Sequence, residues 1–120
     1  MNYIIDINDR PWQAIKNKTK EIEVRTNTPF EKLDYNLLKE DDTLTLVNND
    51  NLEQQNVKVL RITHYKTVRE LLEQEGTTRT LSSGKDLEGG IESINSLTGY
   101  KEGIEKHGVW AIQIIPIDNI

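Results

Sequence analysis

"QNVKVLRITHYKTVRELLEQEG", residues 55–76, decides the fold, because it predicts a long strand followed at once by a helix. In residues 55–65 apolar side chains fall on both faces of an extended chain, which is typical of a central or bulged strand. Thr67 and Glu70 then form a capping box, and Gly76 ends the helix. The apolar face of this helix is made by Val68, Leu71 and Leu72.

Shorter runs before and after this stretch predict four more strands. Residues 2–7 form a short, largely buried strand, residues 21–26 and 42–47 alternate between apolar and polar, and residues 109–117 form a final apolar strand. With the strand at 55–65, these runs make a sheet of about five to six mainly antiparallel strands.

The other helices are weaker. The first begins near Pro11 with Asp9 as its cap, buries Trp12 and Ile15, and ends near residue 17. Another helix follows Asp86, and a helical turn or two precedes the last strand. The order β-α-β-β-β-α-α-β, with sequential antiparallel strands, predicts an α+β fold around a curled sheet or open β-barrel with two to three flanking helices.

Length and composition exclude several classes of protein. A chain of 120 residues fits one domain, residues 1–120. Without cysteine it has no disulfide, thiolate zinc site or cysteine nucleophile. A net charge of −5 argues against tight non-specific DNA binding. The apolar run at the N-terminus is too short for a signal peptide or a membrane span, so we expect a cytoplasmic protein with no membrane partner.

The stretch "KEIEVR", residues 20–25, concentrates charge on one strand. Its alternation places Ile22 and Val24 on one face, and Glu23 and Arg25 on the other. Charged strand faces are usually solvent faces, with surface ion pairs worth under about 1 kcal/mol each. From periodicity alone, a solvent face is therefore a better explanation of this strand than a site.

The order of these pieces resembles an ASCH domain, a member of the PUA-like superfamily, nearly from end to end. The stretches that match are "RPWQAIKNKTKEIEVR", "KEDDTLTLV", "VKVLRITHYKTVRELLEQEG" and "YKEGIEKHGVWAIQI". The family typically has a lysine before a strand that carries Glu-x-Arg, here Lys20, Glu23 and Arg25. A Gly-Asp pair usually opens the next strand. Asp41-Asp42 replaces that pair, which raises the question of how the turn forms.

The resemblance implies a β-barrel with a cleft beside it, where the family is generally proposed to bind RNA. It also implies a second candidate function, because some small members resemble amidohydrolases that remove acyl groups from cytidine. Their catalytic set is a lysine, a threonine and a glutamate. Lys20 and Glu75 match the first and last, and Glu23 stands in place of the threonine.

The substitution of a carboxylate for a hydroxyl bears on this chemistry. A lysine that acts as nucleophile or base must lose its proton, and nearby carboxylates such as Glu23 and Glu75 favour the charged form. We therefore expect a site that binds RNA or a nucleotide-like ligand. In it Lys20 and Arg25 would contact phosphate or other acceptor atoms, Glu23 would orient these cations or accept from an amino group, and Glu75 would close the far side. The amidohydrolase and a non-catalytic interaction module remain alternatives.

Two aromatic residues are candidate stacking platforms for bases. Tyr65 lies at the strand-to-helix corner, where a stacking platform and an amphipathic core residue are equal alternatives. Trp12 packs on a helix face, but it lies beside Arg10 and Pro11, so a half-exposed position at the rim of the cleft is an alternative to burial. The two histidines lack the spacing of a metal site, and the loop around Lys85 lacks the phosphate-loop pattern. We expect no metal and no cofactor.

Overall fold

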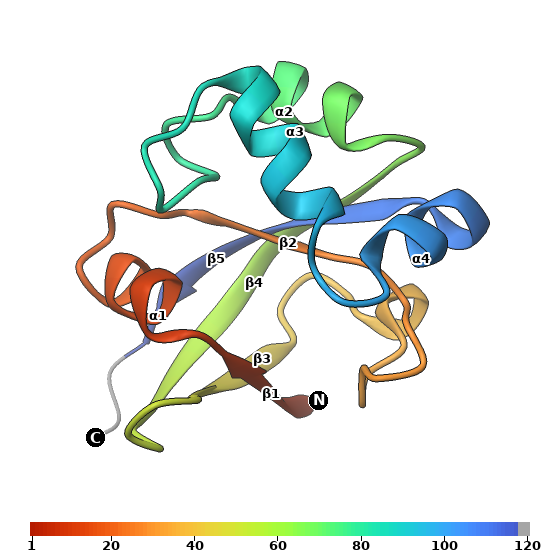
Figure 1. The fold of residues 1–120 in the computed structure, drawn as a ribbon. Coiled ribbons are helices and arrows are strands. Elements are labelled where there is room, and N and C mark those ends of the chain that lie inside the picture. The colour runs from red at the N-terminus through yellow and green to blue at the C-terminus, as the bar shows by residue number, and fades with distance from the viewer. Residues whose placement is uncertain (118–120) are drawn as a thin grey trace.

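The computed structural model describes residues 1–117, so the last three residues of the expected 1–120 domain lie outside the described residues. Within that range the chain forms five strands, four α-helices and one 3-10 turn (Figure 1). In chain order these are β1 (Asn2–Ile7), α1 (Asp9–Lys16), β2 (Ile22–Arg25), η1 (Tyr35–Leu37), β3 (Thr43–Asn48), β4 (Gln54–Tyr65), α2 (Val68–Glu75), α3 (Leu87–Asn95), α4 (Tyr100–His107) and β5 (Val109–Pro116).

The strands form one curled sheet in the order β1-β3-β4-β5-β2. The pairs β3–β4, β4–β5 and β5–β2 are antiparallel, and β1–β3 is parallel. This confirms the predicted α+β open barrel of mainly antiparallel strands. The prediction that strands adjacent in the sequence pair with each other is wrong for the first two strands. β1 pairs with β3, and β2 pairs with the last strand, β5. As a result β1 and β2 are the two edges, and the barrel is open between them.

Each face of the sheet carries a hydrophobic core. One core joins β1, β3, β4 and β5 to α1, whose Trp12 and Ile15 are fully covered. The other packs Ile22 and Val24 of β2 against α2, α3 and α4. Figure 1 shows these three helices on the side of the sheet away from β1. Glu23 pairs in register with Ile112 and therefore lies on the face of the first core.

The helices largely follow the sequence signals. Thr67 caps α2 by accepting from the Glu70 backbone N–H, and Asp86 caps α3 in the same way. The predicted Asp9 cap of α1 is wrong: Asn8 holds that position, and the Asp9 side chain accepts from Asn48 instead. There are four α-helices where two to three were expected, since residues 100–107 make a full helix.

The replacement of the family's glycine leaves the turn before β3 intact. Asp41 takes a left-handed conformation with φ 73°, which Asp adopts at lower cost than most residues. Its backbone N–H donates to the Val59 carbonyl, which ties the turn to β4.

Candidate functional site

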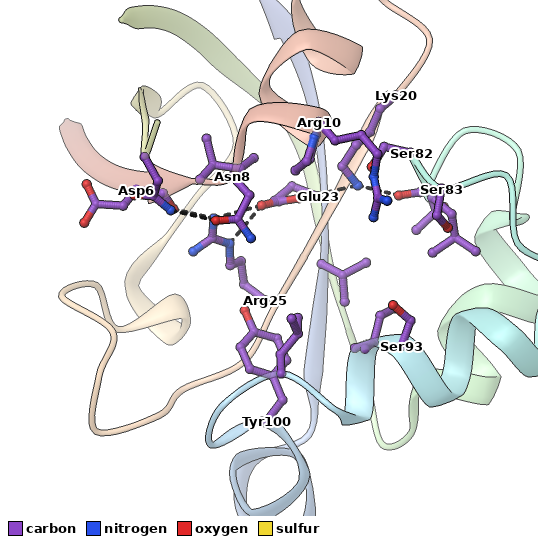
Figure 2. A pocket seen from close by; sticks show the side chains of 18 of the residues that line it. Asp6, Asn8, Arg10, Lys20, Glu23, Arg25, Ser82, Ser83, Ser93 and Tyr100 are labelled. Carbon is purple, nitrogen blue, oxygen red and sulfur yellow. Dashed lines mark hydrogen bonds and ion pairs between the residues drawn. The ribbon is translucent and has the colours of Figure 1, made fainter. Parts of the chain in front are cut away.

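A pocket of about 550 Å³ opens between β1 and β2, the two edges of the sheet. This volume lies in the range of small-molecule sites. Figure 2 shows Lys20, Glu23 and Arg25 lying together here, with Arg10 and Ser82 near Lys20 and Tyr100 near Arg25. We call it the site pocket, and its lining is Asp6, Ile7, Asn8, Arg10, Pro11, Lys20, Glu23, Val24, Arg25, Glu31, Asn49, Thr80, Leu81, Ser82, Ser83, Ser93, Ile94, Leu97, Thr98 and Tyr100.

Lys20 holds its ammonium group at the inner end of the pocket. The turn after α1 places it there through the bond from its backbone N–H to the Ala14 carbonyl. Its Nζ donates to the carbonyls of Ile22, at 2.5 Å, and Thr80, and lies 3.4 Å from Glu23 Oε1. Burial lowers the pKa of Lys20, and the Glu23 carboxylate opposes that shift. Three acceptors match the three donors of an ammonium, so the charged form is the one that this geometry satisfies.

Glu23 bridges Lys20, which precedes β2, and Arg25, which ends it. Its Oε2 accepts from Nε of Arg25 at 2.9 Å and pairs with Arg25 Nη2 at the same distance, while its Oε1 faces Lys20. All three side chains are buried, at 6–8% exposed. Burial alone would raise the pKa of Glu23, but the charges of Arg25 and Lys20 outweigh it and hold that pKa below its usual value. The solvent-face explanation of this strand is therefore wrong.

Arg25 links the two edges of the sheet. Its Nη2 donates to the Asp6 carbonyl of β1 at 2.8 Å, and its Nη1 donates to Glu31 at 3.2 Å. Because β1 and β2 share no ladder of backbone hydrogen bonds, this guanidinium supplies a polar connection across the gap. The donors of Arg25 are thus directed at protein acceptors, which leaves little of the group for a ligand.

Glu31 is a partly buried member of the site that sequence reasoning missed. Its carboxylate accepts from Arg25 and from the hydroxyl groups of Tyr35, at 3.1 Å, and Tyr100, at 3.4 Å. Burial raises the pKa of both phenols, so both remain donors. Glu31 lies in an irregular connection with no periodicity, so no local signal could have identified it.

Two further groups define the mouth and wall of the pocket. Arg10 is exposed, and its Nε donates to Ser82 Oγ at 3.3 Å. In the described part of the chain it forms no ion pair, unlike Lys20 and Arg25. Thr80 is 1% exposed, and its hydroxyl has no hydrogen-bond partner among residues 1–117. An unsatisfied buried hydroxyl beside a pocket is a group that a ligand or a water could satisfy.

The other predicted site residues lie elsewhere. Trp12 is in the core, 1% exposed, with its indole N–H donated to the Leu46 carbonyl, so the predicted rim position is wrong. Glu75 and Tyr65 do not line the site pocket. They meet each other on the helix-covered side of the sheet, where the Tyr65 hydroxyl donates to Glu75 at 2.6 Å. Of the residues next to Trp12 in the sequence, Arg10 and Pro11 do line the site pocket.

Glu75 is the centre of a second ionic cluster. Arg61 donates to both of its oxygens, at 2.7 and 2.9 Å, and Arg79 donates at 3.1 Å. The Arg79 carbonyl accepts from the backbone N–H groups of Glu21 and Ile22, and the next carbonyl, of Thr80, accepts from Lys20. The Glu75 cluster therefore holds the loop that forms one wall of the site pocket, without reaching the pocket itself.

We expect the Glu75 cluster to make the protein sensitive to acid. Hydrogen bonds from Arg61, with help from Tyr65, lower the pKa of Glu75 to about 2. A depressed carboxyl pKa gives stability that is present above about pH 4.5 and lost as the pH falls toward 2. Glu75→Gln should lower the free energy of unfolding by about 2–3 kcal/mol at neutral pH, and this free energy should then depend less on pH between about 4.5 and 2. Urea unfolding at a series of pH values measures both effects. Glu73→Gln, exposed on the same helix, is the control, and equal profiles for the two variants would contradict the prediction.

Among residues 1–117 no group of three or more His, Cys, Asp or Glu side chains could hold a metal ion. Within the same residues no helix is long and apolar enough to cross a membrane.

Comparison with solved structures supports the fold over nearly the whole chain. The hypothetical protein PH0355 has 27% identity and a TM-score of 0.82, covering 98% of this chain and 100% of that chain. The protein PF0455 from Pyrococcus furiosus has 27% identity and a TM-score of 0.75, covering 99% and 100%. A point mutant of ZmASCH from Zymomonas mobilis has the same fold at 16% identity and a TM-score of 0.58, covering 98% and 73%.

No curated protein sequence gives a significant match. The family model named ASCH domain matches residues 5–118, a span that includes the second half of β1, all the later helices and strands of the described chain, and the lining of the site pocket. The match covers far more than half of the chain, and the chain therefore belongs to the ASCH domain family.

Proposed function

We propose that the site pocket binds one nucleotide unit of RNA or a free nucleotide. The observation that carries the proposal is a buried, charged floor beneath a pocket of about 550 Å³. A protein keeps such groups out of water only at a cost, so a site that uses them is a reason for their presence. The ASCH domain family is generally thought to bind RNA, which supports the same ligand class.

The geometry suggests which groups would contact which part of a nucleotide. The ammonium of Lys20 and the guanidinium of Arg25 already donate to protein oxygens. The phosphate would therefore be bound at the mouth of the pocket by Arg10, together with Ser82 and Ser83. Glu23 Oε1 has one contact among residues 1–117, Lys20 Nζ at 3.4 Å, and can accept another hydrogen bond. A base that offers an exocyclic amino group fits this acceptor.

We expect cytidine monophosphate to bind more tightly than uridine monophosphate. Cytosine presents an amino donor where uracil presents a carbonyl oxygen, which a carboxylate would repel. Arg10→Ala should weaken the binding of cytidine monophosphate about tenfold, which corresponds to the loss of one charge-assisted hydrogen bond, and leave the affinity for cytidine unchanged. Isothermal titration calorimetry of each ligand measures both effects.

Arg69→Ala is the matched control for Arg10→Ala. Arg69 is also exposed, but it pairs with Glu88 outside the site pocket. Equal losses in the two variants would mean that a general electrostatic effect, and not this pocket, holds the phosphate. Failure of the wild-type protein to bind either nucleotide would reject the proposal.

The amidohydrolase is the second candidate, favoured by one observation, the burial that lowers the pKa of Lys20. Two features weigh against it. A neutral Lys20 would leave one of its three oxygen acceptors without a proton, and Glu75 lies outside the pocket. Hydrolysis of acetylcytidine by the wild-type protein and not by Lys20→Ala would favour the hydrolase over a binding module.

A further inference from the structure

Phe30 is an aromatic side chain exposed to solvent beside the site pocket. It is 72% exposed, whereas the aromatic rings of the core are covered. Its position is defined by the hydrogen bond from its backbone N–H to Thr28 Oγ1 and by Gly99, where a Cβ would stand 3.3 Å from two ring carbons. The ring is therefore held against the start of α4, while most of its surface remains in water.

The cavities around Phe30 continue the site pocket. A small cavity of about 170 Å³ shares Arg25, Glu31 and Tyr100 with the site pocket. It also shares Thr28 and Phe30 with a third cavity of about 550 Å³ along α4. The three together, which we call the Phe30 groove, run from the floor of the site pocket across Phe30 to the C-terminal end of α4.

The charge of the Phe30 groove differs from that of the rest of the protein. Its lining includes five basic and four acidic side chains, in a chain that has 15 basic and 20 acidic residues. Two of the basic residues, Lys32 and Lys106, are exposed and line the two cavities that also contain Phe30. A polyanion would therefore meet less repulsion here than on the remaining surface.

We propose that the Phe30 groove binds a single-stranded segment of RNA, with one nucleotide in the site pocket and a neighbouring base stacked on Phe30. An exposed ring can stack only on a base that is free of its own helix, which selects single strands over duplexes. Lys32 and Lys106 lie where the following phosphates would pass. This inference rests on the proposed function, which requires only a single nucleotide.

Fluorescence anisotropy with a labelled oligocytidylate of about six nucleotides tests the groove, with cytidine monophosphate as competitor. We expect Phe30→Leu to bind the oligonucleotide about 5- to 150-fold more weakly than the wild type, the range for loss of one base stack. Phe30→Trp should retain binding, because it keeps an aromatic face. Lys106→Gln should weaken the oligonucleotide and reduce the salt dependence of its binding by about one ion.

The controls separate the part of the groove around Phe30 from the site pocket. Leu52→Ala removes an equally exposed apolar side chain, 71%, outside the groove, and should change nothing. Phe30→Leu should leave cytidine monophosphate binding unchanged. Oligonucleotide binding that is indifferent to Phe30→Leu, while Arg10→Ala still weakens the mononucleotide, would overturn the groove and leave the site pocket standing.

Other outcomes also decide the question. A duplex that binds as tightly as the single strand would overturn the proposal, as would self-association of the protein that is lost in Phe30→Leu, which would assign this face to a second copy of the chain. Absence of binding to both the oligonucleotide and the mononucleotide would reject the groove and the proposed function together.

Discussion

Glu23→Gln is expected to lower the free energy of unfolding by about 3–5 kcal/mol, a large part of the 5–15 kcal/mol of a typical domain. The change removes the one charge that both Lys20 and Arg25 face, and it leaves two buried cations with less compensation. Urea unfolding followed by circular dichroism measures the loss. Glu21→Gln, an exposed neighbour two residues earlier, should stay within about 0.5 kcal/mol of the wild type.

A double variant shows whether charge is the cause. Lys20→Met removes one of the two cations, so Lys20→Met with Glu23→Gln should be less destabilised than the sum of the two single variants. The pKa of Glu23 is below its usual value, so its contribution to stability is present at neutral pH and lost on acidification below about pH 4.5. In Glu23→Gln that acid-dependent loss should shrink. Additive single effects would show that Glu23 acts through packing alone.

Gly108→Ala is expected to destabilise the protein by more than about 4 kcal/mol. Gly108 ends α4 with φ 80°, a conformation that costs other residues about 1–3 kcal/mol. In addition, a Cβ at this position would lie 2.6 Å from the Tyr65 carbonyl and 2.3 Å from His64 Nε2. Both belong to β4, so the start of β5 could not keep its pairing without a shift of the backbone.

Gly76→Ala separates the two causes. Gly76 ends α2 with φ 86°, but no atom lies within 4 Å of its added Cβ. Gly76→Ala should therefore lower the free energy of unfolding only by the cost of the unusual backbone conformation, about 1–3 kcal/mol. Thermal and urea unfolding of the two variants measure the difference. Equal losses would mean that the close approach of α4 to β4 contributes nothing.

Local patterns predicted most of the elements of this fold. The strand at 2–7 lies where it was predicted, but the expectation that it is largely buried is wrong, because only Ile5 and Ile7 are buried at this edge of the sheet. The helix at 68–75 lies where the Thr67 cap and Gly76 placed it. These signals are local, because a cap or an apolar face depends on residues a few positions apart. The family resemblance added the association of Lys20, Glu23 and Arg25, which do lie together in one pocket.

The partners of the site could not be predicted in the same way. Glu31 and Thr80 come from two separate connections without a periodic pattern, and Arg10 comes from the first turn of α1. The carboxylate of Glu75 was expected near Lys20, yet it lies with Arg61 and Arg79 on the other side of the sheet. Side chains of opposite charge pair with whichever partner the fold brings near, and spacing along the chain does not specify that partner.

The sequence by itself determined the strands, most of the helices and the caps of α2 and α3, because each depends on one short segment. Only the tertiary structure decided that β1 pairs with β3 in parallel, that β2 lies at the opposite edge, and that the charged face of β2 is buried. In "KEIEVR", alternation correctly divided the two faces of the strand. The helices α2, α3 and α4 cover one of these faces, and the opening between the sheet edges holds the other. Burial depends on what distant segments place over a face, and a local pattern carries no information about them.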